Sequence, residues 1–437
     1  MMTQTFIVNP SNKLHGTLRV PGDKSISHRA IMLGALAEGT THINGFLEGE
    51  DTLATLAAFQ AMGVSIEGPH QGKVTIHGVG LHGLQAPAAP LYLGNSGTSM
   101  RLLSGLMAGQ AFSVEMSGDA SLSRRPMRRV TEPLTTMGAW IETKGTAPLK
   151  IHGGQRLQGI NYTLPVASAQ IKSCLLLAGL YAQGTTCVTA PAPTRDHTER
   201  MLAGFGYSVQ QKGLRVCLQG GGKLQANSIE VPADISSAAF FMVGATIAQS
   251  ADILLKHVGI NPTRIGVINI LRQMGADISL HNQREIGGEP VADIRVCASQ
   301  LHGIDIPKEQ VPLAIDEFPI IFIAAACAAG ETVLTGAQEL RVKESDRIQV
   351  MAEGLRAVGI NAQPTPDGMK IQGGQIQGGV INSHGDHRIA MAFTIAALRA
   401  NDTITIKDCA NVATSFPNFL ELAQTAGIQA STLSKFS

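Results

Sequence analysis

Six repeats of about 70 residues are the feature of this sequence that most limits how it can fold. In each repeat, a turn rich in Gly, Asp, Ser and Pro precedes an Ala/Leu-rich helix. A Thr/Val-rich strand, a second helix that ends on a glycine, and a further strand follow. Because this period is longer than that of common solenoids, each repeat is predicted to be a small α/β subdomain. The glycines that end the second helices are Gly63, Gly138, Gly206, Gly275, Gly359 and Gly427.

The two helices of a repeat differ in composition. The first, as in ASAQIKSCLLLAGL, is apolar nearly all round and is predicted to be buried. The second, as in KESDRIQVMAEGLRAVG, is mixed and is expected nearer solvent. A chain of 437 residues is too long for one core, so six repeats divide most simply into two domains of three. The best boundaries lie near Pro21 and Val231, and the strands that precede Pro21 could complete either domain.

Charge and hydropathy exclude several classes of partner. The chain has 34 Lys and Arg against 33 Asp and Glu, which argues against nucleic acid or a membrane surface. The N-terminal residues lack a basic stretch followed by an apolar run, so no signal peptide is expected. The longest apolar run, residues 318–330, is too short to span a bilayer and is interpreted as a buried helix. We therefore expect a soluble, cytoplasmic protein.

The six cysteines form no CxxC pair and have no zinc-like spacing. We expect all of them to be buried free thiols of a reducing compartment. A metal is not expected at HGDHR either, although it holds His384, Asp386 and His387. The adjacent Arg388 would repel a cation, so Asp386 is predicted to cap a helix instead.

The turns that open the repeats carry the unusual charges. PGDKSISHR places Lys24, Ser25 and Arg29 at the start of a helix, where free N–H groups and the helix dipole favour an anion. A capped helix with solvated charges explains that segment equally well. GNSGTSMR repeats the pattern with Asn95 and Gly97, but it lacks the lysine of a P-loop, so nucleotide binding is not implied.

The densest basic segment is SLSRRPMRR. Arginine forks suit carboxylate and phosphate oxygens, so Arg125 is a candidate anion ligand. Arg128 and Arg129 are expected on a solvated helix face. No aromatic residues are interleaved with these arginines, which argues against single-stranded nucleic acid.

Two further segments contribute carboxylates. RVKESDR combines Lys343, Glu344 and Arg347, which would be an ordinary ion pair at the surface but an acid beside an anion site if buried. AIDEFP places Asp316 and Glu317 before the most apolar helix, where a carboxylate could cap the helix or act as a general base. Cations from several repeats therefore predict a pocket for more than one anionic group, with acid/base chemistry and no metal. The residues concerned are Lys24, Arg29, Arg125, Asp316, Lys343, Glu344, Arg347 and Arg388.

These motifs resemble a known family. LGNSGTSMRLL and RVKESDR are similar to the two signature segments of the 3-phosphoshikimate 1-carboxyvinyltransferases, or EPSP synthases, which are enolpyruvyl transferases. PGDKSISHR, LSRRPM, ASAQ, IDEFP and GDHRIAM resemble further blocks in the same order, so the resemblance covers nearly the whole chain.

The resemblance implies an inside-out α/β fold of two similar domains, each of three βαβαββ units. It implies an N-terminal domain of residues 22–231, mainly on the shikimate 3-phosphate side. Residues 1–21 and 232–437 would form the C-terminal domain, with the active site in the cleft between the domains and closure on binding. It also implies a monomer without a cofactor.

The activity implied is transfer of the enolpyruvyl group of phosphoenolpyruvate to the 5-hydroxyl of shikimate 3-phosphate, in aromatic amino acid biosynthesis. The family's chemistry is addition followed by elimination, with Asp316 taking the hydroxyl proton, Glu344 protonating carbon and Lys24 assisting. The resemblance assigns shikimate 3-phosphate to Lys24, Ser25, Arg29, Ser168, Ala169, Gln170, Arg195, Asp316 and Lys343. It assigns phosphoenolpyruvate to Lys24, Asn95, Gly97, Arg125, Gln170, Arg347 and Arg388.

The chain departs from the commoner family pattern at four positions. Many members have Ser at Ala169, Asn at Glu339 and Lys at Thr414, and Arg195 stands where they use Ser for a phosphate contact. These departures concern the exact phosphate contacts and resemble a second branch of the family, in which the response to inhibitors can differ.

Two alternatives stay open at the level of sequence. The UDP-N-acetylglucosamine 1-carboxyvinyltransferases share the fold and the donor, but they usually carry a cysteine in the loop that corresponds to residues 121–126, and this chain has none before Cys174. A non-catalytic anion-binding repeat protein would not need the acid and base that Asp316 and Glu344 supply.

Overall fold

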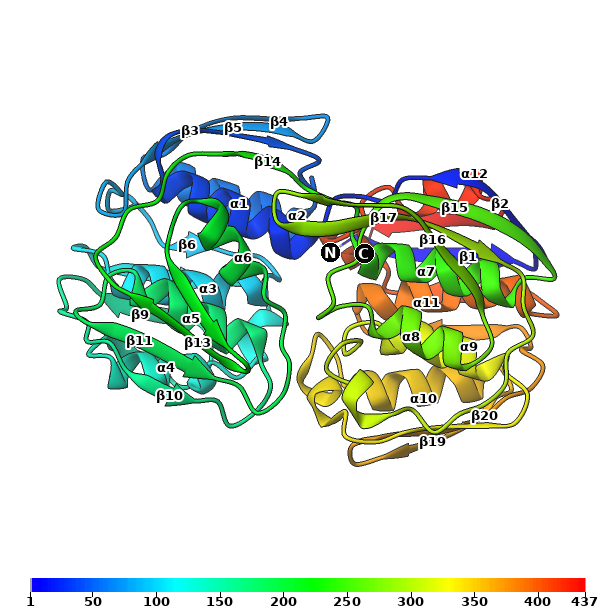
Figure 1. The fold of residues 1–437 in the computed structure, drawn as a ribbon. Helices are drawn as coiled ribbons and strands as arrows, with labels where there is room; N and C mark the ends of the chain where they lie inside the picture. The colour runs from blue at the N-terminus through cyan, green and yellow to red at the C-terminus, as the bar shows by residue number, and fades with distance from the viewer. Residues whose placement is uncertain (1, 437) are drawn as a thin grey trace. The chain divides into compact units, whose positions relative to one another are not determined.

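The structure, a computed structural model, describes residues 2–436, which divide into two compact units (Figure 1). The N-terminal unit comprises Gly22–Val231 together with the turn 286–289. The C-terminal unit comprises the chain up to Pro21, Pro232–Glu285 and the residues from Pro290 onward. Each unit has its own continuous hydrophobic core.

Three inner helices form the centre of each unit. Their sequences are apolar nearly all round, which favours burial on all sides. In α9 all nine residues are buried, as predicted for the apolar run. In the N-terminal unit, Figure 1 shows α1, α3 and α5 enclosed by strands such as β3, β9 and β11. The inner helices are α1 (Lys24–Leu36), α3 (Gly97–Ala108), α5 (Ala169–Gly179), α7 (Ile235–Ile247), α9 (Phe318–Ala326) and α11 (His387–Ala396).

The second helix of each repeat ends as the sequence predicts. All six glycines follow the C-cap residue and have φ between 78° and 111°, a left-handed conformation that side chains with a Cβ disfavour. Each glycine therefore stops its helix and turns the chain into the next strand. These outer helices are α2 (Glu50–Ala61), α4 (Arg128–Thr136), α6 (His197–Gly204), α8 (Gly266–Gln273), α10 (Arg347–Ala357) and α12 (Phe419–Thr425).

The N-terminal unit contains three small mixed sheets, one for each repeat. In each, the first two strands are parallel and the remaining pairings are antiparallel. The first sheet takes its edge strand from the end of the unit. The orders are β14 (Ser228–Glu230), β3 (Glu38–Asn44), β5 (Lys73–Val79), β4 (Ser65–His70); β6 (Leu91–Tyr92), β7 (Val114–Ser117), β9 (Leu149–His152), β8 (Trp140–Glu142); and β10 (Asn161–Thr163), β11 (Thr185–Thr189), β13 (Arg215–Gln219), β12 (Val209–Lys212).

The C-terminal unit repeats this order and uses the chain's own start to complete two sheets. Strand β2 pairs in parallel with β15, and β1 lies antiparallel between β22 and β23. In the three-stranded sheet, isolated bridges at His302 and Asp305 supply the missing edge beside β18. The orders are β2 (Lys13–Leu18), β15 (Ser250–Gly259), β17 (Glu289–Cys297), β16 (Asp277–Ile286); β18 (Glu331–Leu334), β20 (Gly368–Gln372), β19 (Asn361–Thr365); and β21 (Gly379–Asn382), β22 (Ile404–Lys407), β1 (Met2–Asn9), β23 (Gln429–Phe436).

Six small mixed sheets around buried helices confirm the predicted βαβαββ repeats. Short 3₁₀ helices occupy some of the connections. They are η1 (Leu122–Arg124), η2 (Lys308–Gln310), η3 (Gln338–Val342), η4 (Ala397–Arg399) and η5 (Ala410–Thr414). No helix within residues 2–436 is both long enough and apolar enough to cross a membrane.

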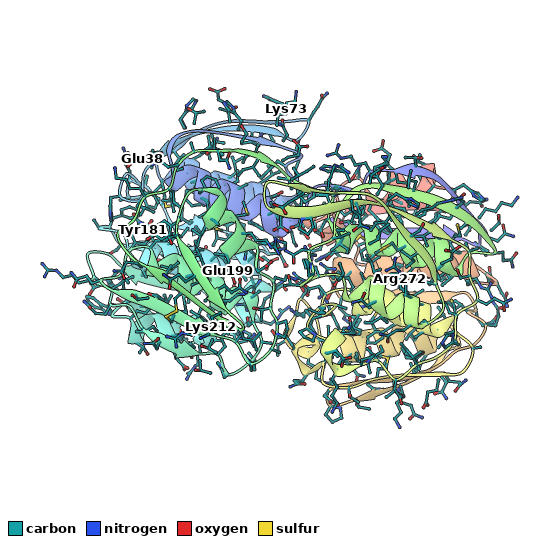
Figure 2. All side chains as sticks on the ribbon, in the orientation of Figure 1. Glu38, Lys73, Tyr181, Glu199, Lys212 and Arg272 are labelled. Carbon is teal, nitrogen blue, oxygen red and sulfur yellow. A yellow bond between two sulfur atoms is a disulfide. The ribbon has the colours of Figure 1, made fainter. Side chains whose placement is uncertain are left out.

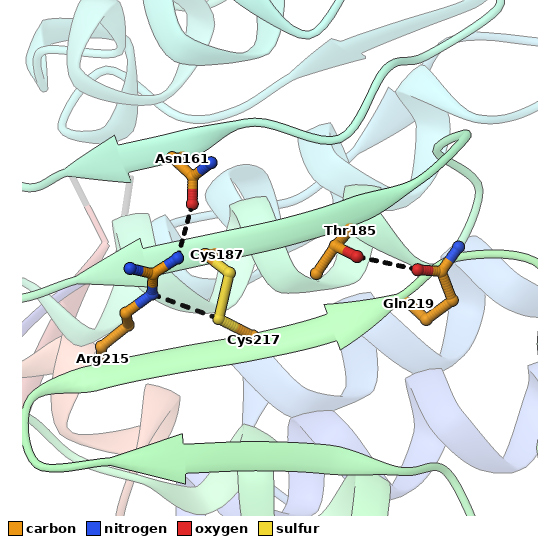
Figure 3. The surroundings of a disulfide bond; sticks show 6 residues. All are labelled: Asn161, Thr185, Cys187, Arg215, Cys217 and Gln219. Atoms are coloured by element: carbon orange, nitrogen blue, oxygen red, sulfur yellow. Dashed lines mark hydrogen bonds between the residues drawn. A yellow bond between two sulfur atoms is a disulfide. The ribbon is translucent and has the colours of Figure 1, made fainter.

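The prediction that all six cysteines are free thiols is wrong. Cys187 of β11 and Cys217 of β13 are directly opposite each other in the antiparallel pair and form a disulfide (Figure 3). Their Cα atoms are 4.1 Å apart, because the register of the two strands makes them cross-strand neighbours. The other four remain free, and Cys297 and Cys327 are only partly buried.

Candidate functional site

Three of the charged residues singled out in the sequence, Lys24, Asp316 and Arg388, lie at or just before the N-termini of inner helices. Five of the six N-cap side chains accept a hydrogen bond from a backbone N–H of their own helix: Asp23, Ser96, Ser168, Asp234 and Asp386. The cap predicted at Asp386 is therefore confirmed. The sixth N-cap residue, Glu317 of α9, makes no such bond, and its carboxylate contacts other residues.

In the N-terminal unit, Arg125 is held over the turn before α3. Its Nη2 donates to Oδ1 of Asn95 at 2.6 Å, and Nδ2 of Asn95 donates to Oδ2 of Asp119 at 2.7 Å. Arg125 is buried, whereas Arg128 is exposed and Arg129 is half-buried at the start of α4. Arg125 thus differs from Arg128 and Arg129 in being buried and hydrogen-bonded beside the start of α3.

Gly97 brings two guanidinium groups close to the first turn of α3. A Cβ at this position would lie 3.0 Å from Nη1 of both Arg101 and Arg125. Arg101 also donates to Oε1 of Gln170 at 2.7 Å, and Nε2 of Gln170 donates to Thr98 at 3.1 Å. Arg101 and Thr98 were not among the predicted site residues, although both stand in the GNSGTSMR motif, where Arg101 comes one helical turn after Gly97.

Arg29 is buried and is hydrogen-bonded on three sides. It donates to Thr198 at 2.7 Å, to Ser173 at 2.9 Å and to the carbonyl of Ser25 at 2.9 Å. Burial lowers the pKa of Arg29 to about 10, although the carboxylate of Glu199 opposes that effect. Glu199, labelled in Figure 2, also pairs with Lys172 in the same buried region.

The other predicted residues of this unit lie at helix starts. Lys24 is the first residue of α1 and donates to Oδ2 of Asp51 at 2.9 Å. Ser168 caps α5, and Ala169 is the first residue of that helix. Arg195 is half-buried in the segment before α6.

In the C-terminal unit, one arginine joins three carboxylates. Arg347, only 1% exposed, donates to Glu344 at 2.6 Å and to Asp386 at 2.8 Å, and its Nη1 lies 3.5 Å from Oδ1 of Asp316. Burial opposes its charge, but Asp386 and Glu344 outweigh that effect and raise the pKa of Arg347. Arg347 therefore stays cationic and fixes the separation of its partners.

Two more cations flank Asp316. Nζ of Lys343 lies 3.3 Å from Oδ1 of Asp316, and Nη1 of Arg388 donates to the Asp316 backbone carbonyl at 2.9 Å. Arg388 therefore lies over the start of α9. Lys343, Asp316 and Glu344 are partly exposed, which leaves two carboxylates and a cation accessible to a ligand.

The structure gathers the predicted residues into two clusters, one in each unit. The C-terminal cluster contains two partly exposed carboxylates beside three cations: Asp316, Lys343, Glu344, Arg347 and Arg388. Within the described residues, no three His, Cys, Asp or Glu side chains are grouped as metal ligands.

Comparison with known proteins identifies the family. The family model for EPSP synthase (3-phosphoshikimate 1-carboxyvinyltransferase) matches residues 8–422. The chain belongs to the EPSP synthase family.

Similar EPSP synthases span almost the whole chain. The 3-phosphoshikimate 1-carboxyvinyltransferase of Methylococcus capsulatus is 70% identical, covering 97% of both chains. That of Nitrosococcus oceani is also 70% identical, covering 98% of this chain and 96% of its own. The solved EPSP synthase of Acinetobacter baumannii superposes with a TM-score of 0.88 at 61% identity, covering 99% of this chain and 100% of its own.

Two of the positions that depart from the commoner EPSP synthase pattern have defined local surroundings. Thr414 is buried in η5 and donates to the carbonyl of Asn411 at 2.7 Å. Glu339 is half-buried in η3, the 3₁₀ helix that leads into Lys343 and Glu344. Thr414 is thus hydrogen-bonded to the backbone of its own segment, whereas Glu339 lies in the segment that leads to Glu344.

Proposed function

We propose that this chain transfers the enolpyruvyl group of phosphoenolpyruvate to the 5-hydroxyl of shikimate 3-phosphate. The products are 5-enolpyruvylshikimate 3-phosphate and inorganic phosphate, in the route to aromatic amino acids. The observation that carries the proposal is the contact of Asp316 and Glu344 with the same buried Arg347. Arg347 thus holds these two carboxylates close together among cations. Acid/base chemistry on an anionic substrate requires such an arrangement.

The proposed reaction is an addition followed by an elimination. Glu344 gives a proton to the methylene carbon of phosphoenolpyruvate, which makes C2 electrophilic. The 5-hydroxyl oxygen then bonds to C2, and its proton passes to Asp316. In the elimination, a proton passes from the methyl carbon back to the Glu344 carboxylate, and the C2–O bond to phosphate breaks. The leaving phosphate takes the electrons of that bond and the proton held by Asp316, and the vinyl group is restored.

The cations stabilise the charges that this sequence of steps moves. Arg347 and Arg388 would hold the carboxylate or phosphate of phosphoenolpyruvate from the C-terminal unit, with Arg125, Gln170 and Lys24 from the N-terminal unit. Donors fixed before the reaction, as Arg125 is by Asn95, need no reorganisation when charge develops.

Shikimate 3-phosphate would be held by small polar and basic side chains, chiefly of the N-terminal unit. Ser168 and Arg195 are the proposed phosphate contacts, with Lys343 and Asp316 on the acceptor's hydroxyls. The remaining proposed contacts are Lys24, Ser25, Arg29, Ala169 and Gln170.

The proposal requires residues of both units to act on the same substrates, so we also propose that the units close when the acceptor binds. Small-angle scattering with and without shikimate 3-phosphate tests this closure. We expect a smaller radius of gyration with the acceptor, and an unchanged scattering curve would contradict closure.

The activity is tested by phosphate release from phosphoenolpyruvate with each of two acceptors. We expect release with shikimate 3-phosphate and none with UDP-N-acetylglucosamine. Release only with the nucleotide sugar would favour the alternative transferase, and release with neither would favour a binding protein.

Matched variants connect this activity to the site. Glu344→Gln should lower kcat at least 100-fold because it removes the acid, a typical contribution of general acid–base catalysis of about 10²–10⁴. Glu353→Gln is the control, because Glu353 is an exposed carboxylate of α10, the helix that begins three residues after Glu344.

A further inference from the structure

Glu317 differs from the other N-cap residues of the inner helices. It is 1% exposed and makes no hydrogen bond to its own helix. Its Oε1 accepts a hydrogen bond from the hydroxyl of Ser236, while its Oε2 has no hydrogen-bond partner among the described residues. A buried carboxylate of this kind requires a compensating positive charge.

Two arginines lie near that carboxylate. Nη2 of Arg264 is 3.8 Å from Oε1 of Glu317, and Nη1 of Arg388 is 3.9 Å from the same atom. Nη2 of Arg264 also donates hydrogen bonds to Oδ1 of Asp234 at 3.1 Å and to the hydroxyl of Ser236 at 2.6 Å. Because Arg264 is shared between two carboxylates, Arg388 is the second cation that balances Glu317.

These contacts join the starts of three inner helices. Asp234 caps α7 and Ser236 lies in its first turn, Glu317 precedes α9, and Arg388 lies in the first turn of α11. Arg388 also donates to the backbone carbonyl of Asp316, the residue next to Glu317. The buried carboxylate therefore lies where it can hold Arg388 over the proposed base.

We propose that Glu317 is a positioning residue for Arg388, held in place by Ser236 and Arg264. This inference rests on the proposed function, because it assigns Arg388 to phosphoenolpyruvate. Glu317 keeps the guanidinium of Arg388 ordered before the substrate binds, so the donor site is prepared in advance. The side chain of Asp316 has its own partners in Lys343 and Arg347, so the acceptor site does not depend on Glu317 in the same way.

Steady-state kinetics of Glu317→Gln test the proposal, together with calorimetric binding of shikimate 3-phosphate alone. The amide keeps the shape but removes the charge. We expect KM for phosphoenolpyruvate to rise about tenfold while Kd for shikimate 3-phosphate changes less than about twofold. Glu317→Asp keeps the charge and should recover most of the donor affinity. Glu331→Gln is the control, because it changes an exposed carboxylate of the same unit, at the start of β18.

An unchanged KM for phosphoenolpyruvate in Glu317→Gln would overturn the proposal. An equal rise in KM for phosphoenolpyruvate and in Kd for shikimate 3-phosphate would overturn it too. If Glu317→Gln does not fold, Ser236→Ala provides the test. This variant retains the carboxylate of Glu317 but removes the hydroxyl that donates to it. We then expect a rise of about threefold in the same KM alone, and no rise would overturn the proposal. A wild-type protein that released no phosphate would instead refute the proposed function, and this inference with it.

Discussion

Nη2 of Arg347 donates a hydrogen bond of 2.6 Å to Oε2 of Glu344, three residues earlier in the chain. The same guanidinium donates to the fully buried Asp386 and lies near Asp316. Arg347 thus connects the proposed acid, the proposed base and the cap of α11. Its removal would leave several carboxylates without their common cation.

Arg347→Met should therefore lower the free energy of unfolding by about 3–5 kcal/mol, because Asp386 would be left as an uncompensated buried charge. Denaturant unfolding measures the change. Arg356→Met, on the exposed face of the same helix, is the control and should cost about 1 kcal/mol or less. A loss in Arg347→Met no larger than the control's would show that the three carboxylates do not depend on Arg347.

Gly97→Ala should weaken the binding of phosphoenolpyruvate without destabilising the fold. The new Cβ would lie 3.0 Å from the guanidinium tips of Arg101 and Arg125, so both flexible side chains must move. Alanine also favours a helix over glycine by about 1 kcal/mol. We expect a higher KM for phosphoenolpyruvate with an unchanged or raised Tm.

The control for Gly97→Ala is Gly204→Ala, at the end of α6, where a Cβ meets nothing within 4 Å. It should leave KM unchanged. If both variants bind phosphoenolpyruvate as the wild type does, the close approach at Gly97 has no role in the donor site.

The stability of the N-terminal unit should decrease in mild acid because of His28. Burial, reinforced by the charges of Lys24 and Arg29, holds the pKa of His28 well below its usual 6.5. Below pH about 6.5 the unfolded chain binds a proton there and the folded chain does not. The free energy of unfolding therefore falls as pH drops, by up to about 1.4 kcal/mol per pH unit from this group.

Denaturant unfolding between pH 7.5 and 5 should show this dependence, with a shallower slope in His28→Gln. The exposed His70→Gln should keep the wild-type slope. Equal slopes in all three proteins would mean that His28 can be protonated in the folded state.

The disulfide predicts a specific thiol count. Protein denatured without reductant should show four free thiols, and six after reduction. Reduction should lower the free energy of unfolding by about 2–4 kcal/mol, because the bond closes a loop between residues 30 positions apart. Six thiols before reduction would show that Cys187 and Cys217 are not bonded.

The repeats made much of the fold predictable. The local sequence is enough to predict a left-handed backbone conformation at each helix-ending glycine, and all six glycines take that conformation. The local sequence does not predict the partner strands of β1, because β1 pairs with β22 and β23, which lie about 400 residues away. The Cys187–Cys217 bond was missed for a similar reason: only the register of β11 against β13 brings the two residues together.

The charged motifs also predict which residues form the two clusters, but they do not predict every contact within the clusters. Lys343, Glu344 and Arg347 are neighbours in sequence, so their proximity could be predicted. Arg264 stands in a segment without a recognisable motif, and its contacts with Asp234 and Ser236 arise only when α7 packs in the folded unit.

The central claim is transfer of an enolpyruvyl group by addition and elimination, and proton and phosphorus NMR of the complete reaction in D₂O test it most directly. We predict inorganic phosphate together with 5-enolpyruvylshikimate 3-phosphate whose vinyl methylene carries deuterium, because the methylene carbon is transiently a methyl group. Glu344→Gln should slow the appearance of both phosphate and the deuterated product at least 100-fold. Phosphate release with no enolpyruvyl product, or a product without deuterium, would contradict the account.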